Sequence, residues 1–348
     1  MTRRALTRGA LAVLAASGLI GLSLQSAGAA EKWSDVVAAA KKEGKVVFYH
    51  NITPKGIEPI LKKFREAYPG IQTEHVRLGS SPLIQRFSAE FGAGRHLADV
   101  VITFTDDRIA KGMKAGWMLK WTPPELAQFP ADVNRENLLF TLQYAREGII
   151  YNKRLVKPAD VPKEWTDLFD PKWKGKVGQN PTWRSVSVQQ LIAYLRKKGI
   201  KDPAEALKAN EVRLFNGSGG IIQAIIRGDI HVAHISDLPV NTAIADGAPV
   251  AIVYPKSGTT LSANQIFVAA KAPHPNAARV FVNWLMTKDG QTALQHFGGL
   301  SVTRKGMPPL SHLPATSALS NTVDGRTILT PALQKEIIEH WRKVFGVK

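Results

Sequence analysis

The sequence predicts an α/β protein built from mostly parallel sheets with helices on both faces. Two short apolar segments of strand type, at 45–52 and 98–104, and an alternating strand at 71–78 are interleaved with segments of helical periodicity. A strand that is apolar along its whole length is typical of a parallel sheet buried on both faces. The alternating order of strands and helices therefore favours an open α/β sheet in the first half of the chain.

Each helix in this half has a start signal. Thr53 and Pro54 supply a cap and a first-turn proline ahead of an amphipathic segment that runs to about Tyr68. Ser80 and Ser81 open the next helix in the same way.

The second half repeats the same architecture without repeating the sequence. Short strands are expected at 175–177, 212–215 and 230–236, and helices at 185–197 and 220–227. Two longer apolar strands, at 140–151 and 261–270, lie between the two halves. The chain therefore has the material for two α/β units, and about 318 residues beyond the first 30 are enough for two domains of about 150 residues.

The N-terminus has the pattern of an export signal over residues 1–30. Arg3, Arg4 and Arg8 precede the apolar stretch 11–24, which is shorter than the roughly 20 residues of a spanning helix. Small residues at 27–29 form a cleavage pattern. The adjacent arginines fit a twin-arginine signal or an ordinary secretory signal, and both place the mature chain in the periplasm.

The composition excludes several classes of function. The chain has no Cys, so disulfides, thiolate metal sites, iron–sulfur clusters and a Cys nucleophile are excluded. The net charge of +18 fits a nucleic-acid binder or a solvated basic surface, and scattered Lys and Arg favour the second. Motifs of serine hydrolases, zinc proteases and P-loop enzymes are missing, which leaves an exported hydrolase as a remote alternative. No cofactor is expected.

Four segments resemble one protein family. They are WTDLFDPKWKGKV at 165–177, GIIYNKRLV at 148–156, NGSGGIIQAIIRGD at 216–229 and KAPHPNAARVFVNWLMTKDGQ at 271–291. The first is also expected to be an ordered surface loop anchored by its tryptophans. Together the segments are similar to bacterial periplasmic solute-binding proteins of ABC importers, in the branch that includes ferric-iron binders.

The resemblance implies a two-lobed periplasmic binding protein fold of type II, with strands crossing between the lobes as a hinge. On this basis lobe 1 comprises 31–140 with 260–300, and lobe 2 comprises 141–259 with 301–348. The implied partners are a small solute and an inner-membrane ABC permease. The protein is expected to be a monomer and to contact the membrane only through the permease complex. Nucleic acid is not an expected partner.

The ligand should lie at the carboxyl ends of the strands, where open α/β sheets bind their ligands. Three strand-to-helix junctions share small residues, hydroxyls and helix-start N–H groups, which favour anions. Arg184 beside Ser185 adds a guanidinium that pairs well with carboxylate or phosphate. The predicted ligand-binding residues are Tyr49, His50, Asn51, Ser80, Ser81, Thr103, Thr105, Thr182, Arg184, Ser185, Ser218, Gly219 and Asp237.

We therefore expect a carboxylate, phosphate or phosphonate as the solute. The iron-binding branch uses two adjacent tyrosines, and the matching positions here are Leu238 and Pro239. Because ferric iron prefers anionic oxygen ligands, this departure disfavours bare iron, and no metal site is predicted. A binder of ferric iron or of an iron chelate stays open as the alternative, with Tyr49, His50 and Asp237 as the residues that could contribute.

Overall fold

The computed structural model describes residues 31–104, 107–310, 313 and 321–347. The predicted export signal, and the site residue Thr105, lie outside these ranges. Residues 33–348 form one compact unit. None of the helices within the described ranges is long and apolar enough to span a membrane.

The elements alternate as the sequence predicted, with several additional helices. The strands are β1 (Lys45–His50), β2 (Gln72–Arg77), β3 (Val100–Phe104), β4 (Asn134–Arg135), β5 (Leu139–Asn152), β6 (Val177–Gln179), β7 (Arg213–Leu214), β8 (Val232–Ser236), β9 (Val250–Val253), β10 (Thr259–Val268), β11 (Ser301–Val302) and β12 (Thr322–Asp324). The helices are α1 (Trp33–Glu43), α2 (Pro54–Ala67), α3 (Ser80–Gly92), α4 (Asp107–Lys114), α5 (Val186–Lys197), α6 (Ala204–Ala209), α7 (Ser218–Arg227), α8 (Asp237–Ala245), α9 (Pro275–Met286), α10 (Lys288–Gly298) and α11 (Pro331–Phe345).

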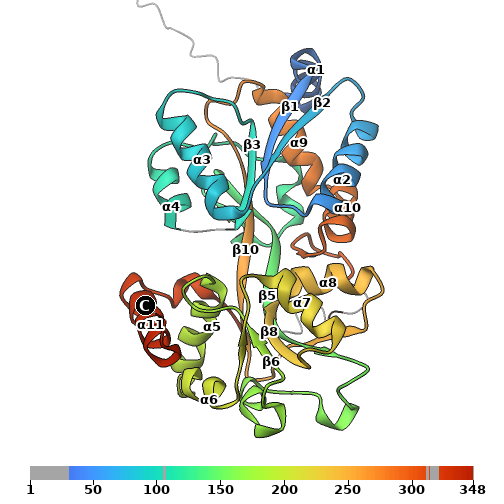
Figure 1. The fold of residues 1–348 in the computed structure, drawn as a ribbon. Helices are drawn as coiled ribbons and strands as arrows, with labels where there is room; N and C mark the ends of the chain where they lie inside the picture. The colour runs from blue at the N-terminus through green and yellow to red at the C-terminus, as the bar shows by residue number, and fades with distance from the viewer. Residues whose placement is uncertain (1–30, 105–106, 311–312, 314–320, 348) are drawn as a thin grey trace, which may run out of the picture. The chain divides into compact units, whose positions relative to one another are not determined.

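The strands pair in the order β2-β1-β3-β10-β5-β8-β6-β7. Within this path β1 pairs in parallel with β2 and β3, and β6 pairs in parallel with β7 and β8. The long antiparallel strands β5 and β10 join the two parallel groups (Figure 1). The mixed α/β fold with two parallel groups confirms the predicted fold class.

The inner strands of each parallel group are buried on both faces. In β1, Val46 and Phe48 enter one apolar cluster, while Tyr49 enters another on the opposite face. In β8, Val232 and Ala233 divide in the same way between two further clusters. Since successive side chains of a strand point to opposite faces, this division explains why the strands read as unbroken apolar segments.

Strand β5 changes partner halfway along its length. Residues Phe140 to Arg146 pair with β10, and residues Glu147 to Tyr151 pair with β8. Residues 301–303 return to the first half of β5, where Val302 pairs with Gln143 and the Thr303 N–H donates to Leu142 O. The division into two lobes stays a prediction, and its boundary at 300 would need to move past these residues.

The segment 165–177 is anchored as predicted. Trp165 is 1% exposed, and its indole N–H donates to Gly258 O at 2.8 Å. Trp173 is also buried. The predicted strand at 175–177 is wrong by two residues, because Gly175 adopts φ +69°, in the left-handed region that strands do not use, and β6 begins only at Val177.

Candidate functional site: a cleft where five helices begin

A cleft of about 440 Å³ lies where five helices begin. Ser80 and Ser81 of α3, Arg108 of α4, Val186 and Ser187 of α5, Ser218 of α7, and Leu238 and Pro239 of α8 line it. Ala145, Glu147 and Ser262 of the two long strands lie beside them. The cleft therefore collects strand-to-helix junctions from both parallel groups of the sheet.

Helix starts leave backbone N–H groups without partners in the helix. Among the described residues, no side chain caps the first N–H groups of α3, α7 or α8. Of the cleft helices whose N-cap residue the structure describes, α5 is the one with such a cap, where Ser185 Oγ accepts from the Val188 N–H at 3.4 Å. Three helices therefore present uncapped N–H groups and the positive ends of their dipoles at the cleft.

One arginine lies on the cleft. Arg108 donates from Nη2 to Ser81 Oγ at 2.8 Å and from Nη1 to Ser81 O at 3.2 Å. These bonds hold the guanidinium at the start of α3. Arg108 lies beyond Thr103 and Thr105, the residues predicted for the site at the end of this strand, and was therefore missed.

Two strand-to-helix junctions are joined directly. Asn180 Oδ1 accepts from the Gly217 N–H at 3.0 Å, which ties the end of β6 to the start of α7. Gly217 adopts φ +130°, a conformation that other residues rarely take. Asn51 links the end of β1 in the same manner, since its Nδ2 donates to Ser80 Oγ and Asn264 Oδ1, both at 3.1 Å.

Tyr49 and His50 do not lie on the cleft as predicted. They are the last two residues of β1, and both side chains are buried away from it. The Tyr49 hydroxyl donates to Glu90 Oε2 at 2.9 Å. His50 Nε2 lies 3.0 Å from His75 Nδ1, and burial, with the nearby charges of His75 and Arg77, lowers the pKa of His50 to about 3.

Other predicted residues lie behind or beside the cleft. Thr103 and Thr182 are fully buried and do not line it. Arg184 and Gly219 are exposed but do not line it either, and Ser185 serves as the cap of α5. The structure therefore brings Ser80, Ser81 and Ser218 together at the cleft. Asn51 donates a hydrogen bond to Ser80, and Ser185 caps α5.

Asp237 lies beneath the cleft, not on it. It is fully buried, and it accepts from the Arg146 backbone N–H at 3.1 Å and from the Tyr254 hydroxyl at 2.9 Å. Burial raises the pKa of Asp237 to about 7, although Arg146 and Tyr254 oppose the rise. The neighbouring residue Ser236, but not Asp237, lines the cleft.

Apolar side chains cover part of the wall. Leu238 and Pro239, at the positions that match the tyrosine pair of iron binders, both line the cleft. Val186 adds an aliphatic side chain that is 53% exposed. No phenolate is present at this part of the wall, so iron coordination of the tyrosine-pair type has no ligands here.

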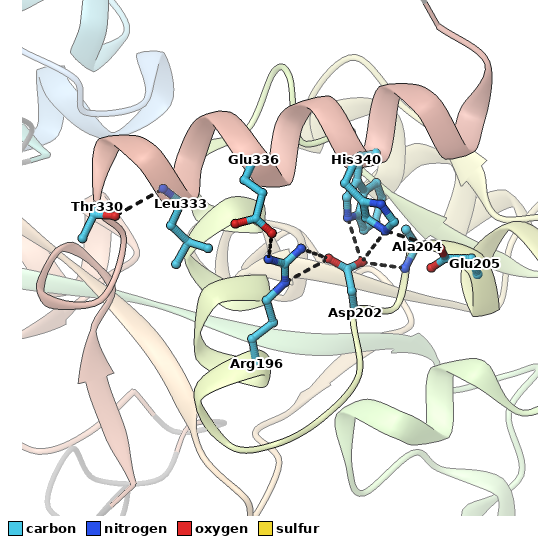
Figure 2. Close-up of polar contacts among 9 residues, drawn as sticks. Arg196, Asp202, Ala204, Glu205, Thr330, Leu333, Glu336 and His340 are labelled. Atoms are coloured by element: carbon cyan, nitrogen blue, oxygen red, sulfur yellow. Dashed lines mark hydrogen bonds and ion pairs between the residues drawn. The ribbon is translucent and has the colours of Figure 1, made fainter.

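A second cluster has the composition of a metal site, but its central carboxylate already accepts hydrogen bonds from the protein. Asp202, Glu205 and His340 form the one group of three potential metal ligands found in the described ranges (Figure 2). Asp202 accepts four hydrogen bonds, from Arg196 Nε and Nη2, the Ala204 N–H and Trp341 Nε1. Because these donors occupy both carboxylate oxygens, the cluster serves to hold α11 against α5 and α6.

The comparisons with known proteins agree with this geometry. Residues 50–292 match the family described as bacterial extracellular solute-binding protein, and the chain belongs to it. It is 24% identical over 236 residues to the spermidine/putrescine-binding periplasmic protein 1 of Haemophilus influenzae, an alignment of 66% of this chain and 63% of that protein. It is 26% identical over 159 residues to the Fe(3+)-binding periplasmic protein of Serratia marcescens, covering 42% and 46% respectively.

The fold is shared with solved structures of the same kind. The substrate-binding protein of an ABC transporter from Agrobacterium tumefaciens aligns with a TM-score of 0.74 at 18% identity, covering 86% of this chain and 94% of that one. The chain therefore belongs to the bacterial extracellular solute-binding proteins and has the fold of such proteins. This confirms the resemblance seen in the sequence.

Proposed function

We propose that this protein captures a small anionic solute in the cleft between the starts of α3, α4, α5, α7 and α8. The loaded protein would then deliver the solute to an inner-membrane ABC permease from the periplasm. The convergence of five helix starts on one cleft is the observation that carries the proposal.

The electrostatics of the cleft support an anion. Uncapped N–H groups at α3, α7 and α8 can each donate to a carboxylate, phosphate or phosphonate oxygen. Arg108 adds a full positive charge that is already held in place by Ser81. Guanidinium and backbone N–H groups together match the planar oxygen pairs of such anions.

The named relatives do not determine which solute is bound. One is named for spermidine and putrescine and another for ferric iron, and each alignment covers less than two thirds of the relative's length. The cleft itself disfavours direct iron binding, since Leu238 and Pro239 supply no oxygen ligand. Iron already chelated by an organic anion is the second candidate, because the helix starts could hold the chelator.

The test is a thermal-shift and calorimetric screen of organic acids, phosphate esters and phosphonates, with matched variants. Arg108→Gln should weaken binding of the best anion at least about tenfold, because a hydrogen bond to a charged group contributes about 1.5–3 kcal/mol. Arg184→Gln removes the same charge from an exposed residue outside the cleft and should change the affinity less than about twofold.

The outcomes separate the candidates. A wild-type protein that bound only neutral sugars, with equal affinity in Arg108→Gln, would contradict the anion proposal. A shift with ferric citrate and none with citrate alone would favour the chelate. We expect neither a visible absorption band nor iron retained after desalting when ferric salts are added.

A further inference from the structure

Glu147 is a charged residue at the point where β5 changes partner. It pairs with Ser236 of β8, while the preceding Arg146 pairs with Leu261 of β10. The Glu147 side chain lines the cleft, yet the residue is only 4% exposed. A carboxylate is thus placed at the floor of a cleft whose other charged lining residue is Arg108.

One oxygen of this carboxylate has no donor. Within the part of the chain that the structure describes, Glu147 Oε2 is buried and accepts no hydrogen bond. His234 Nε2 lies 2.8 Å from Glu147 Oε2, an ion-pair distance when the imidazole is protonated, but this contact is not a hydrogen bond, and neither ring nitrogen of His234 has a hydrogen-bond partner among the described residues. Buried carboxylates are costly unless they are hydrogen-bonded, so this atom calls for a donor.

The surrounding charges do not supply that donor. Arg146 precedes Glu147 in β5, and its Nη1 donates to Ser301 Oγ at 2.9 Å. Asp237, under the same floor, already receives the Arg146 N–H and the Tyr254 hydroxyl. The inner side of the cleft therefore carries an acceptor oxygen without a donor, Glu147 Oε2, while the helix starts at the cleft carry donor N–H groups.

We propose that Glu147 binds an ammonium group, or another N–H donor, of the solute, so that the solute has both an anionic end and a cationic end. The anionic end lies at the helix starts and Arg108, and the amine lies at Glu147. This inference rests on the proposed function and narrows it from anions in general to amine-bearing acids. In this proposal Glu147 is the residue that makes the protein prefer an amine-bearing acid over the same acid without the amine.

The experiment uses the full mature chain and matched triplets of small molecules. Each triplet contains an alkyl carboxylate or phosphonate of two to five carbons, the same acid with a terminal amine, and the alkylamine alone. Affinities are measured by calorimetry for the wild type, Glu147→Gln and Arg108→Gln. The Gln variant keeps the size and one acceptor oxygen but removes the negative charge.

We expect the amine-bearing acid to bind at least about tenfold more tightly than the plain acid in the wild type. Glu147→Gln should abolish this preference while leaving plain-acid binding within about twofold, and Arg108→Gln should weaken both acids. A purely structural role for Glu147 predicts lower stability and no change in the preference.

Failure of the inference is distinguishable from failure of the proposed function. Equal binding of the plain and amine-bearing acids, or a preference that survives in Glu147→Gln, overturns the inference and leaves the anion site intact. Binding of the alkylamine alone, insensitive to Arg108→Gln, overturns the anionic function. A protein that binds no member of any triplet overturns both.

Discussion

Two groups of histidine and carboxylate side chains in this molecule look alike in composition and differ in hydrogen bonding. At the cleft, His234 and Glu147 approach to 2.8 Å, and the carboxylate still has an oxygen without a donor among the described residues. Under α11, His340 lies 3.8 Å from Asp202, whose two oxygens accept four hydrogen bonds from other groups (Figure 2).

The difference indicates which of the two carboxylates, Glu147 or Asp202, is available to bind a ligand. A carboxylate that is saturated by the protein stabilises the fold, and a further ligand would have to displace good donors. A carboxylate that is buried at a cleft without donors costs stability, and a ligand that supplies the donor recovers that cost. Composition alone does not distinguish the two, whereas the hydrogen-bond partners do.

The largest expected effect comes from removing the saturated carboxylate. Asp202→Ala leaves the buried indole N–H of Trp341 and the guanidinium of Arg196 without their acceptor. We expect the free energy of unfolding to fall by about 2–3 kcal/mol in urea denaturation, with solute affinity unchanged. Glu205→Ala is the control, since this exposed residue should change stability by less than about 0.5 kcal/mol.

A third histidine, His50, extends the comparison. It is buried, and among the described residues its hydrogen-bond contact is the imidazole of His75, not a carboxylate. The folded-state pKa of His50 is about 3, below its ordinary value of 6.5, so the unfolded chain binds a proton that the folded protein does not between these values. Stability from this residue is therefore present above about pH 6.5 and is lost as the pH falls.

Comparison of wild type with His50→Gln isolates this contribution. Asp237 acts in the opposite direction, since its pKa of about 7 lies above the ordinary 3.8 and its contribution falls as the pH rises through that window. Between pH 6.5 and 5 the wild type should lose about 1–2 kcal/mol more than the variant in urea denaturation. Parallel losses would mean that His50 is protonated in the folded protein.

The smallest expected effect is the response to zinc. Because donors of the protein occupy both oxygens of Asp202, we expect zinc to stabilise wild type and His340→Ala to the same extent in thermal melts. A stabilisation that depends on His340 would show that the cluster opens to accept the ion, and the contrast with the cleft would then be lost.

The sequence predicted the helix starts well and the strand ends poorly. Ser80 was placed correctly and the start of α7 was predicted only two residues late, at 220, because glycine, serine and proline give local start signals that need no knowledge of the tertiary structure. Tyr49 and His50 were misplaced because their burial depends on helices from elsewhere in the chain, such as α9, whose Phe281 packs on Phe48. Such long-range packing leaves no mark on the local pattern.

Glu147 was missed for a different reason. It lies inside an apolar segment that was interpreted only as a hinge strand. Its signal was present, since two adjacent charges, Arg146 and Glu147, interrupt a strand that is otherwise buried on both faces. A charged pair inside a buried strand requires partners, and this requirement could have identified the cleft floor from the sequence.

The most direct test of the contrast is one set of thermal melts of wild type, Glu147→Gln and Asp202→Ala, with and without the amine-bearing acid that binds best. Glu147→Gln should melt at or above the wild-type temperature alone and lose most of the ligand-induced shift. Asp202→Ala should melt well below the wild type alone and keep the full ligand-induced shift. If Asp202→Ala lost the ligand-induced shift, or Glu147→Gln kept it, the assignment of the cleft carboxylate to binding and of the Asp202 cluster to stability would be contradicted.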